Sequence, residues 1–332
     1  MSTGVTTSAA AVRAGRTPAV PRWVVLVVVW AALIAVPYWL PLLGGYTALA
    51  GRVLVFGLAA MGLNLLLGFT GVLSFGHAAY FGLGAYGAGL FLKYVAASTA
   101  LAMLAGTLLA GVAGTLFGTL LVRRRGVYFA MVTIAFGQVC FYIAYKWDDF
   151  TGGYDGLRGF TRAPLDFGLF KIDIASNGTL FYFFVLVVFG LAVGLQALIL
   201  KSPFGRTMLA IRENERRARF LGLPVERHIW LSFSISCFFT GLAGSLYALL
   251  NNFADPLGLN YVMSGNLVMI TVMGGMRTFW GPLVGAVLFV MLQDYVSSMT
   301  TNWMFFVGIT FVLVVLVFPR GLMGILQRRS GA

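Results

Sequence analysis

Charged side chains are concentrated in one segment of this chain, residues 201–228, which reads KSPFGRTMLAIRENERRARFLGLPVERH. The segment holds seven of the 23 Lys and Arg residues and three of the ten acids. Apolar residues recur through it at helical spacing, with arginines and glutamates between them, which is typical of an amphipathic helix. Pro203 near its start and Gly222 and Pro224 near its end are ordinary helix boundary signals. We therefore expect an amphipathic helix over residues 207–222 whose charged face contacts another part of the protein or a partner. A helix in a loop whose charges are only solvated is the alternative.

Polar side chains also interrupt the apolar remainder of the chain, among them Asn64, Ser74, His77, Gln138 and Asp294. If such groups line a pore, His77 and Ser74, which lie among glycines, are the strongest candidates for contact with what passes through it. For each of the five the alternative is a hydrogen bond between packed helices, which is the more common role of a lone polar residue in such a segment.

The sequence excludes several kinds of chemistry. A Walker A loop needs a lysine directly after a glycine, and none of the four lysines follows one. His, Cys, Asp and Glu do not cluster at metal-ligand or acid–base spacing, and the two cysteines, Cys140 and Cys237, fall inside apolar runs typical of a core. We therefore expect no metal site, no bound cofactor and no enzymatic activity in this chain, so any ATP and Mg²⁺ must be bound by a partner.

The composition indicates an integral membrane protein. The 332 residues are 60% hydrophobic and only 10% charged, with a mean hydropathy of +0.91, whereas soluble domains are about 25% charged. We expect an all-α polytopic bundle of about ten transmembrane helices in a single domain, residues 23–320. A basic, flexible N-terminal segment, residues 1–22, precedes it, and a basic tail, residues 321–332, follows.

The ten apolar segments that we expect to span the membrane are 23–40, 49–68, a helix ending near 93, 97–122, 127–145, 180–200, 229–250, 261–276, a helix ending near 296, and 303–318. Two glycine-rich stretches, near 68–76 and 274–282, are expected to break helices, and they hint at a parallel internal repeat. Between residues 97 and 122 a small residue recurs every four positions, which predicts close helix packing.

The distribution of basic residues predicts the orientation. With the N-terminus in the cytoplasm, seventeen Lys and Arg lie inside and six outside, which the positive-inside rule favours. Both termini and the 201–228 segment are then cytoplasmic, and the loop 146–178 is external. The net charge of +13 reflects this topology and anionic lipid rather than nucleic acid.

The external loop alternates aspartates with arginines and lysines. Such a surface suits the docking of a soluble protein, and we select Asp155, Gly156 and Arg158 as candidate contacts. A solvated loop without a partner explains the same charges and remains the alternative.

Five spaced stretches resemble motifs of one known family. The segment at 201–228 contains the pattern Gly205-(x6)-Arg212-Glu213-Asn214-Glu215-(x2)-Ala218-(x3)-Gly222. It resembles the cytoplasmic coupling helix of ABC importer permeases, specifically those of the branched-chain amino-acid and urea or amide family. The stretches at 68–86, 151–157, 273–286 and 318–324 look like other motifs of this family in the same order, although residues 276–280 depart from its pattern.

The resemblance implies a permease subunit of an ATP-driven importer in a bacterial cytoplasmic (inner) membrane, closer to the M-type than to the H-type permease. It implies two ATPase subunits, a second homologous permease and an external substrate-binding protein as partners, and the seven residues of the pattern as the contact with the ATPase. Branched-chain or hydrophobic amino acids are the preferred substrates, with urea or short amides as the alternative. The alternative of a different class is an ion-coupled secondary transporter, which should carry paired intramembrane carboxylates.

Overall fold

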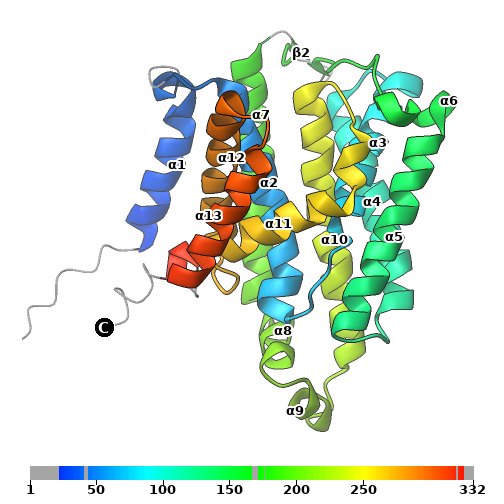
Figure 1. The fold of residues 1–332 in the computed structure, drawn as a ribbon, viewed down its shortest axis with the longest axis vertical. Coiled ribbons are helices and arrows are strands. Elements are labelled where there is room, and N and C mark those ends of the chain that lie inside the picture. The colour runs from blue at the N-terminus through cyan, green and yellow to red at the C-terminus, as the bar shows by residue number, and fades with distance from the viewer. Residues whose placement is uncertain (1–21, 41–43, 167–170, 176, 319–320, 325–332) are drawn as a thin grey trace, which may run out of the picture.

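The structure is a computed structural model that describes residues 22–40, 44–166, 171–175, 177–318 and 321–324. The predicted basic N-terminal segment up to residue 21, and the tail from residue 325, lie outside the described residues. The described part is a bundle of long helices with two short helices projecting from one end and a small hairpin at the other (Figure 1).

Each of the ten predicted apolar segments corresponds to a helix, and the observed bounds differ from the expected ones by a few residues. The helices are α1 Arg22–Trp39, α2 Thr47–Asn64 with a π-helical continuation η2 Leu65–Thr70, α3 His77–Tyr94, α4 Thr99–Leu121, α5 Val127–Lys146, α7 Gly178–Lys201, α10 Val225–Asn251, α11 Tyr261–Gly274, α12 Gly281–Met299 and α13 Trp303–Val317.

Seven of the helical stretches within the described residues are long and apolar enough to cross a membrane. Three of the ten helices, α1, α3 and α11, do not meet these criteria, and the cause differs among them. Residues 29–39 of α1 and the 14 residues of α11 are short apolar helices, whereas the hydropathy of α3 is lowered by glycines, tyrosines and His77. Because α3 is largely buried among other helices, it does not need an apolar surface toward lipid.

The core lies where α2, α3, α4 and α10 pack together. The predicted small-residue stripe is confirmed, because Gly106, Ala110, Gly114 and Gly118 are all buried on one face of α4. A Cβ at Gly106 would lie 2.2 Å from the carbonyl oxygen of Gly84, and one at Gly114 would lie 2.4 Å from Cβ of Cys237. The stripe therefore lets α3 and α10 approach the α4 backbone closely, as the spacing predicts.

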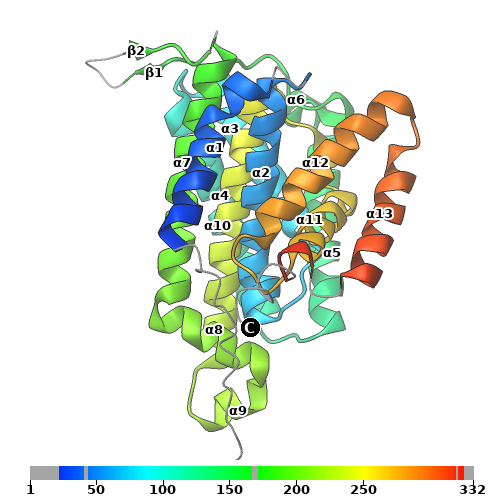
Figure 2. The same cartoon turned by 90° about the vertical axis from the view of Figure 1, so that its left-hand side faces the viewer.

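Both glycine-rich stretches interrupt helices, as expected. Residues 71–76 separate η2 from α3, and residues 275–280 separate α11 from α12. We call them the first break and the second break. Figure 1 shows α11 running obliquely across the bundle, and Figure 2 shows α12, which follows the second break, as an oblique helix on the side of the bundle.

The end of the bundle that carries the loop between α5 and α7 contains α6 Asp148–Thr151, the 3₁₀ turns η3 Gly153–Asp155 and η4 Pro256–Leu259, and a two-residue hairpin of β1 Leu165–Asp166 and β2 Lys171–Ile172. At the opposite end lie α8 Pro203–Glu213 and α9 Glu215–Phe220. The prediction of one helix over 207–222 is wrong in this respect, because Asn214 has an extended backbone, with φ −159°, that divides it in two.

Candidate functional site

Four of the seven pattern residues fold the α8–α9 segment. A Cβ at the buried Gly205 would lie 2.3 Å from the carbonyl oxygen of Leu200, so only glycine allows the tight turn from α7 into α8. The Asn214 side chain accepts a hydrogen bond of 2.9 Å from the Arg217 N–H and caps α9. Ala218 is buried in a small core of α8, α9 and the start of α10. Gly222, the fourth, ends α9.

The end of α9 is a Schellman motif. The Gly222 N–H donates to the Arg219 carbonyl at 2.9 Å, and the Leu223 N–H donates to the Ala218 carbonyl at 3.1 Å. Gly222 has φ +78°, a conformation that favours glycine because it has no Cβ. The sequence signal that predicts a helix end here is therefore explained by backbone geometry.

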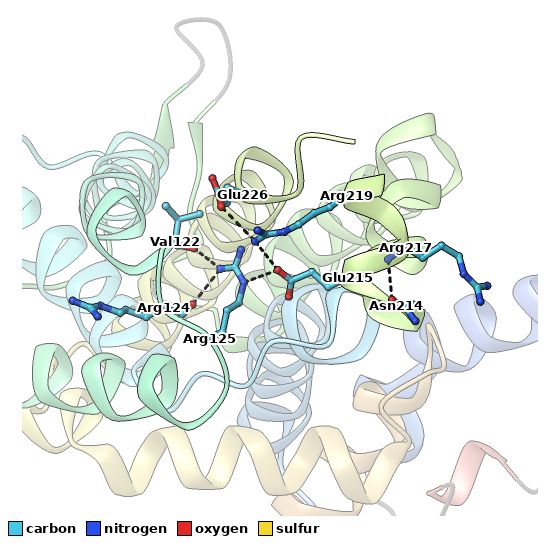
Figure 3. A network of polar contacts seen from close by, with 8 residues as sticks. All are labelled: Val122, Arg124, Arg125, Asn214, Glu215, Arg217, Arg219 and Glu226. Carbon is cyan, nitrogen blue, oxygen red and sulfur yellow. Dashed lines mark hydrogen bonds and ion pairs between the residues drawn. The ribbon is translucent and has the colours of Figure 1, made fainter. Parts of the chain in front are cut away.

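Glu215 ties α9 to the turn between α4 and α5 (Figure 3). One of its oxygens accepts from Arg125 Nε at 2.9 Å and from Arg219 Nη2 at 3.0 Å. Arg219 also lies 3.4 Å from Glu226 at the start of α10. Arg125 in turn donates to the carbonyls of Val122 and Arg124. Glu215 is thus engaged within the chain, while Glu213 is exposed and forms no ion pair among the described residues.

Arg212 connects α8 to the first break. Its Nη1 donates to the Leu67 carbonyl at 3.4 Å, and a Cβ at Gly71 would lie 3.0 Å from Arg212 Cγ. Gly71 has φ +81° and ends η2. Partial burial, and then the nearby charge of Arg277 in the second break, lower the pKa of Arg212. The guanidinium therefore lies close to both breaks.

The second break contacts η2 and the end of α2 directly. Asn64 Nδ2 donates to the Thr278 carbonyl at 3.0 Å, and a Cβ at Gly68 would lie 2.0 Å from the Met276 carbonyl oxygen. Asn64 is buried, and its Oδ1 has no hydrogen-bond partner among the described residues. Asn64 therefore joins two interrupted helices instead of facing an open channel in this conformation.

Side chains from neighbouring helices satisfy the free N–H groups around the first break. The Phe75 N–H donates to Thr133 Oγ1 of α5 at 3.2 Å, and the Ala78 N–H donates to Ser264 Oγ of α11 at 2.8 Å. Non-helical backbone at membrane depth needs such partners because lipid offers none.

Ser74 and His77 belong to a buried chain of hydrogen bonds. His77 Nδ1 lies 2.9 Å from Ser74 Oγ, and its Nε2 lies 2.7 Å from Ser236 Oγ of α10. Because Ser236 donates to the Gly62 carbonyl at 2.6 Å, its oxygen must accept from His77, which assigns the ring proton to Nε2. His77 and Ser74 are fully buried, so the structure places them in the packed interior, linking α3 to α10 and α2.

Gln138 and Asp294 lie apart from this chain. Asp294 Oδ1 accepts from the Tyr46 hydroxyl at 2.7 Å and lies 3.8 Å from Arg52 Nη1, so it joins α12 to the start of α2. Gln138 Nε2 on α5 is buried, with no hydrogen-bond partner in the part of the chain that the structure describes. The five polar candidates are therefore not brought together into one site.

In the loop that follows α5, glycine geometry again explains much of the motif. Gly156 has φ +72° and is buried beside Ala254, and Leu157 and Ala254 exchange two backbone hydrogen bonds that fasten the loop to the segment after α10. Asp155 is exposed, as is Arg158, whose guanidinium lies 5.4 Å from the ring centroid of Phe253. These two, unlike Gly156, are available to a partner.

A model of the family described as branched-chain amino acid transport system, permease component, matches residues 45–315. The chain belongs to this family. As a permease it is similar over 298 residues, at 28% identity, to the high-affinity branched-chain amino acid transport system permease protein LivM of Escherichia coli, covering 84% of this chain and 70% of that one. The M-type assignment fits this likeness.

More distant likenesses cover only part of the permease. A probable branched-chain amino acid transport permease protein LivH of Methanocaldococcus jannaschii is 31% identical over 126 residues, 38% of each chain. An autoinducer 2 import system permease protein LsrD of Yersinia enterocolitica is 30% identical over 155 residues, 44% of this chain and 43% of that one. No solved structure matches the permease.

The sequence does not indicate which residues the α8–α9 segment, His77 and Asn64 contact in the fold. Arg125, Ser236 and Thr278 are not among the residues that the sequence singles out. The run Arg123–Arg124–Arg125 was a usable signal, because an acid-containing segment elsewhere on the same side of the membrane is its natural partner. Nothing in the sequence indicates which of the three arginines is used.

Proposed function

We propose that this permease is the M-type subunit of an ATP-driven importer and that the α8–α9 segment carries the motion of partner ATPases into the membrane. The observation that carries this proposal is the position of Arg212 and Glu215. From one amphipathic segment they reach the first break and the α4–α5 turn. Movement of the segment would therefore displace an interrupted helix and a second helix pair together.

The outer surface of α9 suits contact with an ATPase. Phe220 is 91% exposed and Leu221 is 73% exposed, and Arg216 and Arg217 beside them are also exposed. Apolar side chains with this exposure next to cations are typical of a docking site. In this arrangement Glu213 is the one acid of the predicted pattern left free for an ATPase, since Glu215 is held within the permease.

The proposed orientation places α8 and α9 in the cytoplasm and the α6 and β1–β2 end outside, in a bacterial inner membrane. The structure supports it in one respect. The α4–α5 turn, which contains Arg123–Arg125, is joined to α9 by the Arg125–Glu215 ion pair, so this basic turn and the basic α8–α9 segment lie at the same end of the bundle, as the positive-inside rule requires of the cytoplasmic side. The partners in this scheme are two ATPase subunits, a second permease and an external binding protein, which would meet exposed Asp155 and Arg158.

We propose branched-chain or other hydrophobic amino acids as the substrate. The LivM relative, named for that transport, is similar over most of the chain. Urea or a short amide remains the alternative, because an apolar path with few charges would serve it as well and because an external binding protein supplies most of the selectivity.

The test is uptake by the reconstituted system. Proteoliposomes containing the permease, its partner permease and the ATPases should take up labelled L-leucine only when the binding protein is outside and ATP is inside. Uptake by the purified chain alone, driven by an ion gradient, would overturn the proposal in favour of a secondary transporter. Uptake of urea but not of leucine would retain the importer and replace its substrate.

A further inference from the structure

A cavity of about 570 Å³ separates the α8–α9 junction from the membrane helices. Its walls are the end of η2 and the first break at residues 70–75, the start of α5 at residues 125–130, and residues 211–215. This size falls in the range of small-molecule sites, about 300–1,000 Å³. The ion pairs of Glu215 and the contact of Arg212 with the first break are made beside the cavity. These contacts therefore do not explain why the cavity is there.

The polar part of the wall carries two charges of each sign: Arg125 and Arg212, and Glu213 and Glu215. Some of this polar capacity is unused. Arg125 Nη2 is buried with no hydrogen-bond partner among the described residues, and Glu213 forms no ion pair among them. A buried donor without a partner is costly unless a ligand or water satisfies it.

The remainder of the wall is mainly apolar. Its side chains come from the first break, from α5 and from the start of α10, and they include Val72, Leu73, Phe75, Val127, Ala130 and Ile229. A ligand that matches this cavity must present an apolar body together with charged groups.

The charge balance decides the kind of ligand. An anion would gain the two arginines but face both glutamates, and a cation would gain the glutamates but face both arginines. A zwitterion offers an opposite charge to wall groups of both signs at once. We propose that this cavity binds a zwitterionic amino acid with an apolar side chain, its carboxylate toward Arg125 Nη2 and Arg212, its ammonium toward the Glu215 oxygen that pairs with neither Arg125 nor Arg219, and its side chain against Val127 and Leu73.

The consequence rests on the proposed function and orientation. On the cytoplasmic side, such an amino acid would be the released substrate, bound between the three elements whose relative movement couples ATP hydrolysis to transport. A ligand that fits one arrangement of these elements better than another shifts the permease toward that arrangement. Cytoplasmic substrate would therefore slow further cycles, which is product inhibition at the coupling segment.

The test measures binding without the binding protein. Permease assembled with its partner permease and ATPases in nanodiscs is titrated with labelled L-leucine by scintillation proximity. Val127→Trp fills the cavity from an exposed position of α5 without removing a charge. Tyr128→Trp is the matched control, because Tyr128 is the next residue, is similarly exposed at 74% against 67%, and does not line the cavity. We expect at least a tenfold weaker affinity for Val127→Trp and wild-type affinity for Tyr128→Trp. Equal affinities in both variants, or no binding to the wild type, would overturn the site.

Two leucine analogues test the charge argument. 4-Methylpentanoate lacks the ammonium group and 3-methylbutylamine lacks the carboxylate, and we expect each to compete with leucine at least tenfold more weakly than unlabelled leucine does. Competition by 4-methylpentanoate at full strength would show a plain anion site and contradict the zwitterion. These results are independent of uptake. A system that binds leucine here and imports only urea would refute the proposed substrate while leaving the site intact.

Discussion

Replacing Glu215 by Gln tests the connection between α9 and the α4–α5 turn. The carboxylate accepts from both Arg125 and Arg219 while it is 34% exposed, and the two arginines are 29% and 51% exposed. Partly exposed pairs contribute about 0.2–1 kcal/mol each. Only the pair with Arg125 crosses to the α4–α5 turn, because Arg219 lies in α9 itself, so the neutral amide should weaken the attachment of α9 by about 0.2–1 kcal/mol. A change of this size cannot unfold the bundle, but it shifts the attached state of α9 by a factor of about 1.4–5.

We therefore expect Glu215→Gln to insert normally, to shift the melting temperature of the purified permease by a few degrees at most, and to reduce ATP-dependent leucine uptake several-fold. The assay is uptake together with ATPase activity in proteoliposomes. Glu213→Gln is the control for stability and for α9 attachment, because it removes a nearby charge that forms no ion pair within the described residues. A double-mutant cycle with Arg125→Met isolates the 2.9 Å pair.

The reasoning is refuted if the effects of Glu215→Gln and Arg125→Met on uptake are simply additive, because the two side chains would then not act through each other. It is also refuted if Glu215→Gln leaves uptake unchanged while Glu213→Gln abolishes it. In that case the proposed contact of Glu213 with the ATPase would be enough for coupling, and the internal ion pair of Glu215 would be dispensable.

Three further predictions concern the packing around the segment and the breaks. Gly222→Ala should lower the free energy of unfolding by about 1 kcal/mol, because Gly222 has φ +78°, and it should lower uptake. Gly194→Ala in α7 is the control, because an added Cβ there meets nothing within 4 Å. It should leave the melting temperature and uptake close to wild type. His77→Phe should remove two buried hydrogen bonds and destabilise the permease by about 1–3 kcal/mol, seen as a lower melting temperature; an unchanged one would show that the network does not stabilise the fold. Asn64→Leu should remove the 3.0 Å bond to the Thr278 carbonyl and uncouple ATP hydrolysis from uptake more than it lowers stability, and a proportional loss of both would contradict a role in transmission.

Hydropathy and glycine position were sufficient to predict most of the fold. Each apolar run became a helix because a chain in lipid must satisfy its backbone within the segment, and the stripe at Gly106, Ala110, Gly114 and Gly118 lies where its spacing placed it. The division of the α8–α9 segment was missed because amphipathic periodicity continues across Asn214. Asn214 followed by Glu215 is, however, a helix N-terminus signal, so the sequence does contain a local indication of the division.

The site could be predicted only in part, because its contacts join residues far apart in the sequence. Arg125 and Glu215 are separated by 90 positions and Asn64 and Thr278 by 214, and no local pattern specifies such pairs. Sequence reasoning marked His77 as polar within an apolar stretch, but whether it lines a path or is enclosed depends on Ser236, which a single sequence does not connect to it.

The direct contact of η2 with the second break limits how the permease can change shape. Where helices meet through long side chains, a small shift of one can be absorbed by a change of rotamer in the other. Gly68 meets the Met276 carbonyl without such an intermediary, so there is no rotamer to adjust and the contact is stiff. A displacement of either interrupted helix must then move the other by a comparable distance or separate the two altogether, which makes this point better suited to an abrupt opening than to a graded one.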